Sequence, residues 1–187
     1  MDHYLDLKLL PDPEFAATQL MSALFAKLHR GLVELGSTAI GISFPDGDSA
    51  GHGFGQRLRL HGSAAALDQL LAGNWLKGMR DHVQLGELAV VPANAQHRRL
   101  RRVQVDSNPE RLRRRAIKRH GLTEEQARQR IPDHAGKTTA LPFIDLRSQS
   151  SGQRFRLFIA QGPLQTNPQP GTFNAYGLSH EATVPWF

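Results

Sequence analysis

Residues 14–35 read EFAATQLMSALFAKLHRGLVEL, and they carry the clearest periodic pattern in the chain. Large apolar side chains recur here at helical spacing, at Phe15, Leu20, Met21, Leu24, Phe25, Leu28, Leu32 and Leu35. Gly36 follows at once, and glycine favours the left-handed conformation in which many helices end. The segment therefore predicts one long amphipathic helix, whose apolar face must pack against other elements of a core.

The segments around this helix read as strands and one further helix. Residues 3–9 and 56–61 alternate between apolar and polar side chains, as half-buried strands do. Residues 40–44 form a short apolar strand, Ser63 can cap a helix that runs to residue 71, and residues 82–91 read as a last strand. This βαββαβ order is the ferredoxin-like pattern. Many functions use that fold, so the fold alone does not indicate an activity.

A linker at residues 92–96 divides the chain, so we expect a ferredoxin-like domain at 1–94 and a smaller α+β domain at 95–187. The second domain should hold an extended segment at 98–105, an arginine-rich helix at about 108–120, a second short helix after Thr123, and antiparallel strands at 141–149, 153–161 and 172–179. The arginine-rich helix has two possible starts: a capping box of Ser107 and Glu110, or Asn108 as cap with Pro109 in the first turn.

The composition limits the classes of function. The chain has 187 residues and no cysteine, which excludes disulfides, a thiolate nucleophile and a cysteine zinc site. No segment approaches the ~18 apolar residues of a membrane helix, and the N-terminus lacks a signal sequence, so a cytoplasmic protein is expected. The net charge of +6 is concentrated after about residue 95. Such asymmetry indicates a polyanionic partner for the second half.

The arginine-rich helix is the clearest candidate for contacts with that polyanion. Its basic side chains gather at Arg111, Arg114, Arg115, Lys118 and Arg119. So many like charges on one helix disfavour it unless phosphates neutralise them, although a solvated basic face remains the alternative. Arg102 and Gln104 point to one side of an extended segment and could grip guanine and adenine, or belong to an exposed charged linker.

Single residues give weaker indications. His29 lies at the edge of the apolar face of the long helix, where an imidazole can transfer protons near neutral pH, but a structural histidine is favoured by the pattern alone. Ser148 is ordinary for a turn, and Tyr176 fits core packing. Phe155 and Phe158 should point to opposite faces of a strand, so that one of them could stack on a base. The histidines form no metal-binding motif.

Six motifs resemble a known family: MDHYLD at 1–6, SNPERLRRR at 107–115, LRSQS at 146–150, FRLFI at 155–159, YGLS at 176–179 and VPWF at 184–187. Together they run from one end of the chain to the other. On these residues the chain resembles the CRISPR-associated endoribonuclease of type I-F systems, an RNase of the RAMP superfamily that processes precursor CRISPR RNA.

The resemblance implies roles for the matching residues. His29 and Ser148 correspond to the catalytic pair, and Tyr176 to the residue that places His29 and the substrate. The arginine-rich helix would enter the major groove of the repeat hairpin, where Arg114, Arg115, Lys118 and Arg119 would contact phosphates or bases. The lysine at position 118 would offer a point charge in place of a two-pronged guanidinium contact. Arg102 and Gln104 would read bases low in the stem, and Phe155 would stack on the closing base pair. The loop at 46–53 cannot be aligned, so no role is inferred for it.

The implied activity is cleavage at the 3′ base of the stem by attack of the substrate's own 2′-hydroxyl, without cofactor or metal. The enzyme would then retain the product stem within the type I-F CRISPR RNA-guided surveillance complex. The rival hypotheses are a non-catalytic RNA-binding subunit of a ribonucleoprotein and a DNA-binding regulator. A 2′-deoxy substitution at the cleavage nucleotide separates the three. The enzyme should bind the substituted RNA but cut only the unsubstituted one, the RNA-binding subunit should cut neither, and the DNA-binding regulator should be indifferent to the change.

Overall fold

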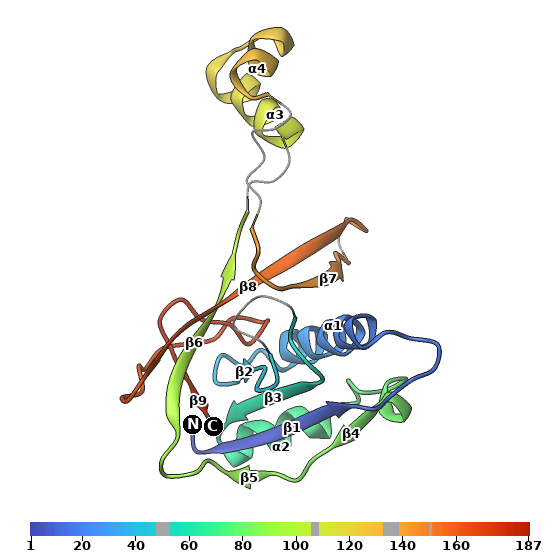
Figure 1. Ribbon diagram of the computed structural model, residues 1–187, viewed down its shortest axis with the longest axis vertical. Helices are drawn as coiled ribbons and strands as arrows, with labels where there is room; N and C mark the ends of the chain where they lie inside the picture. The colour runs from blue at the N-terminus through green and yellow to red at the C-terminus, as the bar shows by residue number, and fades with distance from the viewer. Residues whose placement is uncertain (48–52, 106–108, 133–138, 150) are drawn as a thin grey trace. The chain divides into compact units, whose positions relative to one another are not determined.

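The computed structural model describes residues 1–47, 53–105, 109–132, 139–149 and 151–187, except for the side chain of Arg111. The described residues form a mixed α+β protein with two antiparallel sheets and four α-helices. Packing contacts group them into two compact units (Figure 1). The first unit comprises Met1–Val103 and Leu141–Phe187, and the second comprises Gln104–Ala140.

The first sheet has the order β2-β3-β1-β4, and β5 also pairs with β1. Its strands are β1 (His3–Leu9), β2 (Gly41–Ser43), β3 (Arg57–Gly62), β4 (Val83–Leu85) and β5 (Ala89–Val90). The alternation seen in the sequence has the expected cause, because Leu5, Leu7 and Leu9 of β1 are all buried. Leu5 and Leu7 lie opposite Leu60 and Leu58 of β3, so one face of this sheet is apolar. Helices α1 (Ala17–Leu35) and α2 (Ala64–Ala72) contact each other and β1.

Helix α1 is the long helix that the sequence predicts, but it begins three residues later. The Asp12 Oδ1 atom accepts hydrogen bonds from the backbone N–H groups of Glu14 and Phe15, both at 2.9 Å, which holds these residues in a turn. Phe15 is consequently outside the helix and 47% exposed. The helix ends as expected at Gly36, whose φ is +64° and whose N–H donates to the carbonyl of Leu32.

Two strand predictions need correction. The strand expected at 82–91 is split into β4 and β5 after a short 3₁₀ turn, η1 (Arg80–His82). The N–H of Gly86 donates to the carbonyl of Asp6 at the point where the split begins. The strand expected at 172–179 is wrong, because its residues 175–177 form a turn. The strand nearby is β9 (Val184–Trp186) instead.

The second sheet has the order β7-β8-β6-β9 and contains β6 (Gln96–Val103), β7 (Phe143–Arg147) and β8 (Arg154–Gln165). The hairpin expected at 141–161 is therefore present. Strand β6 starts directly after a turn closed by the N–H of Ala95 on the carbonyl of Pro92. Strand β6 pairs with β8 and β9, so its packing contacts group it with residues 1–95 in the first compact unit. The boundary of this unit therefore lies after Val103, whereas the sequence places the division between domains near residue 94. That division stays a prediction.

The second unit holds the basic helix. Helix α3 (Pro109–His120) ends before Gly121, whose φ is +64°. Helix α4 (Glu124–Arg130) begins with a capping box of Thr123 and Gln126. The two possible starts of α3 involve Ser107 and Asn108, which lie outside the described residues. No helix in the described ranges is long and apolar enough to cross a membrane.

Candidate functional site

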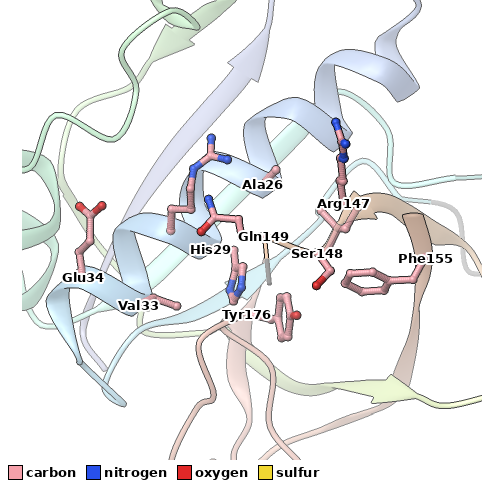
Figure 2. A pocket seen from close by; sticks show the side chains of 11 residues that line it. Ala26, His29, Val33, Glu34, Arg147, Ser148, Gln149, Phe155 and Tyr176 are labelled. Atoms are coloured by element: carbon pink, nitrogen blue, oxygen red, sulfur yellow. The ribbon is translucent and has the colours of Figure 1, made fainter. Parts of the chain in front are cut away.

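A cavity of about 510 Å³ opens in the first unit beside α1. Figure 2 shows the side chains around it. They come from α1, from the end of β7 and the turn after it, from β8, and from the turn at 174–178. The lining residues are Ala26, His29, Arg30, Val33, Glu34, Leu146, Arg147, Ser148, Gln149, Phe155 and Tyr176. The three expected catalytic residues, His29, Ser148 and Tyr176, thus share one cavity with Phe155, although up to 147 positions separate them in sequence.

His29 is held from two directions. Its Nδ1 atom lies 2.8 Å from the carbonyl oxygen of Ala175, which is a hydrogen bond over 146 positions of sequence. Its ring stacks on that of Tyr176, with centroids 4.1 Å apart and planes 13° apart. The side chain is half-buried at the edge of the apolar face of α1, as the sequence predicts. Only one of its two ring nitrogens has a hydrogen bond to protein in the described part of the chain.

Tyr176 lies on the turn that replaces the expected strand. Its ring is nearly parallel to that of Phe25, at a centroid distance of 6.3 Å, so it joins the core to His29. The turn depends on Gly177, whose φ is +69°. A Cβ atom there would lie 2.6 Å from Cγ2 of Ile42, so only glycine fits this close approach. The packing expected for Tyr176 is present, and it places the ring against His29.

Ser148 follows the last residue of β7 and belongs to the hairpin turn. Its N–H donates to the carbonyl of Gln153, and its own carbonyl accepts from Gly152. Its Oγ atom accepts a hydrogen bond from the N–H of Ser151 at 3.2 Å. The backbone of Ser148 is therefore tightly fixed, while its side chain lines the same cavity as His29 (Figure 2).

The side chains of Phe155 and Phe158 have different surroundings, as the strand pattern predicts. Phe158 packs against Phe143 with ring centroids 5.5 Å apart, whereas Phe155 lines the cavity. The guanidinium of Arg102 lies 6.0 Å from the ring centroid of Phe155 and 5.9 Å from that of Tyr176. Arg102 thus belongs to the surroundings of the site. Gln104 is the first residue of the other unit, and its side chain is exposed.

Helix α3 presents exposed basic side chains at Arg114, Arg115, Lys118 and Arg119. The side chain of Arg111 lies outside the described part of the structure. Arg113 behaves differently, because its Nε donates to the carbonyl of Ile131 at 2.7 Å and so joins α3 to the segment after α4. This arginine supports the unit, and no pattern in the sequence predicts its bond to Ile131.

Sequence reasoning missed several residues of the cavity. Arg30, Val33 and Glu34 extend its lining along α1 beyond His29. It also missed the carbonyl of Ala175, since no sequence pattern marks a backbone acceptor that meets a residue 146 positions away. Among the described residues, no three His, Asp or Glu side chains gather in a way that would hold a metal ion.

Comparisons with known proteins agree with the resemblance read from the motifs. The model of the family described as "CRISPR-associated protein (Cas_Csy4)" matches residues 4–187. The "CRISPR-associated endonuclease Cas6/Csy4" of Pseudomonas aeruginosa (strain UCBPP-PA14) is 58% identical over 187 residues, covering 100% of both chains. The protein of the same name from Escherichia coli (strain UTI89 / UPEC) is 51% identical, again over 100% of both chains. On these matches, the chain belongs to the Csy4 family of CRISPR-associated endonucleases.

Proposed function

We propose that this chain binds the hairpin of a CRISPR repeat in precursor RNA and cuts the RNA at the 3′ base of the stem. The observation that carries the proposal is the cavity in which His29, Ser148, Tyr176 and Phe155 meet. Membership of a family of endonucleases supports a cutting reaction. The net charge of +6 and the exposed basic face of α3 support a nucleic-acid substrate.

In the proposed reaction the nucleophile belongs to the substrate. The 2′-hydroxyl next to the scissile phosphate attacks phosphorus, the bond to the 5′-oxygen breaks, and that oxygen takes up a proton. The products are a 2′,3′-cyclic phosphate and a 5′-hydroxyl. Since the RNA supplies both reacting oxygens, the step needs neither an enzyme nucleophile nor a metal ion, and no cofactor is proposed.

The protein residues then act on protons and geometry. His29 takes the proton of the 2′-hydroxyl as general base, which typically contributes ~10²–10⁴-fold. Ser148 orients that hydroxyl from a backbone fixed by hydrogen bonds to Gln153 and Gly152. Tyr176 keeps the imidazole in place by stacking. Correct alignment of the attack contributes further, because the reacting groups are held before the reaction begins.

Recognition is divided among three sets of residues. Phe155 stacks on the closing base pair of the stem, since aromatic rings bind RNA by stacking on bases. Arg102 and Gln104 read bases low in the stem, as guanidinium and amide groups pair bidentately with guanine and adenine. The helix α3 enters the groove of the hairpin, with Arg111, Arg114, Arg115, Lys118 and Arg119 facing phosphates or bases. Such contacts depend strongly on salt.

Most of these contacts lie on the stem, which stays with the upstream fragment after cleavage. We therefore infer near-single-turnover behaviour and retention of the product, as suits a cytoplasmic subunit of the type I-F surveillance complex. The order β2-β3-β1-β4 with two helices also supports a ferredoxin-like arrangement of the N-terminal part. The chain would then combine a ferredoxin-like domain at 1–94 with an RNA-hairpin-binding domain at 95–187.

The test is incubation of the chain with an end-labelled repeat hairpin in EDTA, with chemical identification of the fragment ends. Cleavage that leaves a cyclic phosphate is expected from the parent and not from His29→Ala, which should still bind. A non-catalytic RNA-binding subunit would bind the hairpin without cutting it. A DNA-binding regulator would bind the RNA and DNA forms of the hairpin alike.

A further inference from the structure

We propose that the carbonyl of Ala175 fixes His29 as the tautomer protonated on Nδ1, and that Asn174 is the positioning residue that holds this carbonyl in place. The inference rests on the proposed role of His29 as general base. It assigns the lone pair that takes the proton to Nε2, and it gives a role to a side chain that does not line the cavity.

The tautomer follows from the chemistry of the hydrogen bond. A carbonyl oxygen can only accept, so the contact of 2.8 Å from the Nδ1 atom of His29 to Ala175 requires a proton on Nδ1. A neutral imidazole carries one ring proton, which leaves Nε2 with its lone pair. In the other tautomer, Nδ1 would turn a lone pair toward the carbonyl oxygen, and Nε2–H could not accept a proton from the RNA.

The imidazole of His29 can donate to the carbonyl of Ala175 in one ring orientation only. A flip of the imidazole would exchange Nδ1 with a carbon atom, and the hydrogen bond to Ala175 would be lost. The stacked ring of Tyr176, at a centroid distance of 4.1 Å, keeps the plane of the imidazole fixed. After proton transfer, the same carbonyl still accepts from Nδ1–H, now on a charged ring, and so stabilises the state that the reaction forms.

The position of the Ala175 carbonyl depends on a turn closed by Asn174. The Oδ1 atom of Asn174 accepts from the N–H groups of Tyr176 at 2.8 Å and Leu178 at 3.3 Å. The backbone of Asn174 donates to the carbonyl of Leu178 and accepts from the N–H of Gly177. These hydrogen bonds of Asn174 close the turn that contains Ala175 and Tyr176, the two residues that hold His29.

The turn as a whole is attached to the core by other bonds. The N–H of Phe173 donates to the carbonyl of Thr38, and the N–H of Ile42 donates to the carbonyl of Gly177. Phe173 and Leu178 are buried. Loss of the Asn174 side chain leaves these attachments in place, so the substitution loosens the turn without removing its anchors.

The test reads the tautomer directly by NMR in the full chain labelled with ¹⁵N-histidine, at a pH where His29 is neutral. The signals are assigned by their loss in His29→Gln. We expect the pattern of an Nδ1–H imidazole in the parent and a mixture of tautomers in Asn174→Ala. Asn174→Asp keeps an oxygen that can accept both hydrogen bonds, so it should keep the parent pattern.

Single-turnover cleavage is measured on the same proteins. Asn174→Ala should cut roughly tenfold more slowly, as expected from the loss of one or two ordinary hydrogen bonds, with unchanged affinity for the hairpin. Asn174→Asp should cut at close to the parent rate. An Nε2–H pattern in the parent, or an Asn174→Ala protein that keeps the parent tautomer, would overturn the inference. If His29→Ala cleaves normally, the proposed function fails, and the NMR spectrum of the parent still tests the tautomer separately.

Discussion

His29 and Tyr176 stack almost face to face, with ring centroids 4.1 Å and planes 13° apart. Tyr176 in turn lies parallel to the buried ring of Phe25. The imidazole is thus connected through one aromatic ring to the core of the first sheet and its helices. The phenol hydroxyl contributes nothing to the stack itself, so the ring and the hydroxyl can be separated by substitution.

Tyr176→Phe should therefore reduce the single-turnover rate only modestly, because the ring remains. Tyr176→Ala removes an aromatic pair of the kind worth ~0.5–1.5 kcal/mol, and it should slow cleavage several-fold more than Tyr176→Phe. Both variants should bind the hairpin like the parent. Equal losses in the two variants would instead assign the role of Tyr176 to its hydroxyl.

Ser148→Ala should slow the chemical step strongly while leaving the dissociation constant of the hairpin nearly unchanged. The backbone bonds of Ser148 to Gln153 and Gly152 do not involve its hydroxyl, so the turn should persist. Ser151→Ala is the matched control, since Ser151 is exposed in the same turn and does not line the cavity. If both variants cleave at the parent rate, Ser148 is only a residue of the hairpin.

Arg102 and Gln104 are expected to read bases, so their replacement should cost discrimination more than general affinity. Arg102→Ala or Gln104→Ala should lose ~1–3 kcal/mol of preference for the correct base pair, measured by swapping single pairs low in the stem. Arg101→Ala serves as the control, because Arg101 is an exposed neighbour of Arg102 on β6 that does not line the cavity. A Gln104→Ala protein that discriminates like the parent would remove Gln104 from the set of base readers.

The basic face of α3 should make binding steeply dependent on salt. Replacing Arg115 and Arg119 together by alanine should weaken binding, reduce the salt slope by about 2, and speed release of the product. Arg128 and Arg130 on α4 allow a control with the same loss of charge. Rapid multiple turnover by the parent at physiological salt would contradict the proposed retention of the product.

Stability at acidic pH should depend on His61, which is completely buried beside Ser43. Burial lowers the pKa of His61 from 6.5 to about 3, with smaller contributions from Arg59 and His97. Between these two values the unfolded chain binds a proton that the folded chain does not, so stability falls as the pH drops through this window. Above the pKa of the unfolded chain, His61 is neutral in both states, and its burial no longer lowers the stability through protonation.

Melting temperatures measured from neutral pH down to about pH 4 test whether stability falls with pH as the lowered pKa of His61 predicts. His61→Gln cannot titrate, so its melting temperature should fall less steeply with pH than that of the parent, even if it is lower throughout. His120→Gln changes an exposed histidine of α3 and should leave the slope unaltered. Identical slopes for the parent and His61→Gln would show that His61 does not control acid stability.

Much of the fold could be predicted because periodicity reports burial directly. The leucines of β1 are buried as their spacing indicates, and so is most of the stripe of α1, whose last member, Leu35, is partly buried. The apolar residues of segment 172–179 are typical of a strand. The hydrogen bond from the N–H of Tyr176 to Oδ1 of Asn174 and the positive φ of Gly177 form a turn there instead. Strand β9 was missed since it is only three residues long and contains Pro185, which strand patterns disfavour.

The site was less accessible to pattern reasoning than the fold. Spacing alone favoured structural roles for His29 and Tyr176, and only the family resemblance indicated catalysis. The contact that matters joins the Nδ1 of His29 to the carbonyl of Ala175, 146 positions away, and a backbone acceptor leaves no trace in residue type. The arginine cluster was visible in the sequence, but the separate role of Arg113 in joining α3 to Ile131 was not.

In the proposed reaction, the substrate's own 2′-hydroxyl attacks the phosphate after its proton passes to His29. The most direct measurement compares the all-ribose repeat hairpin with one that carries a single 2′-deoxy substitution at the nucleotide before the cut, both in EDTA, for binding and for single-turnover cleavage. We expect equal affinity for the two RNAs, cleavage of the first to a 2′,3′-cyclic phosphate, and no cleavage of the second. Cleavage of the deoxy-substituted hairpin, or failure to cut the all-ribose hairpin until a metal ion is added, would rule out this mechanism.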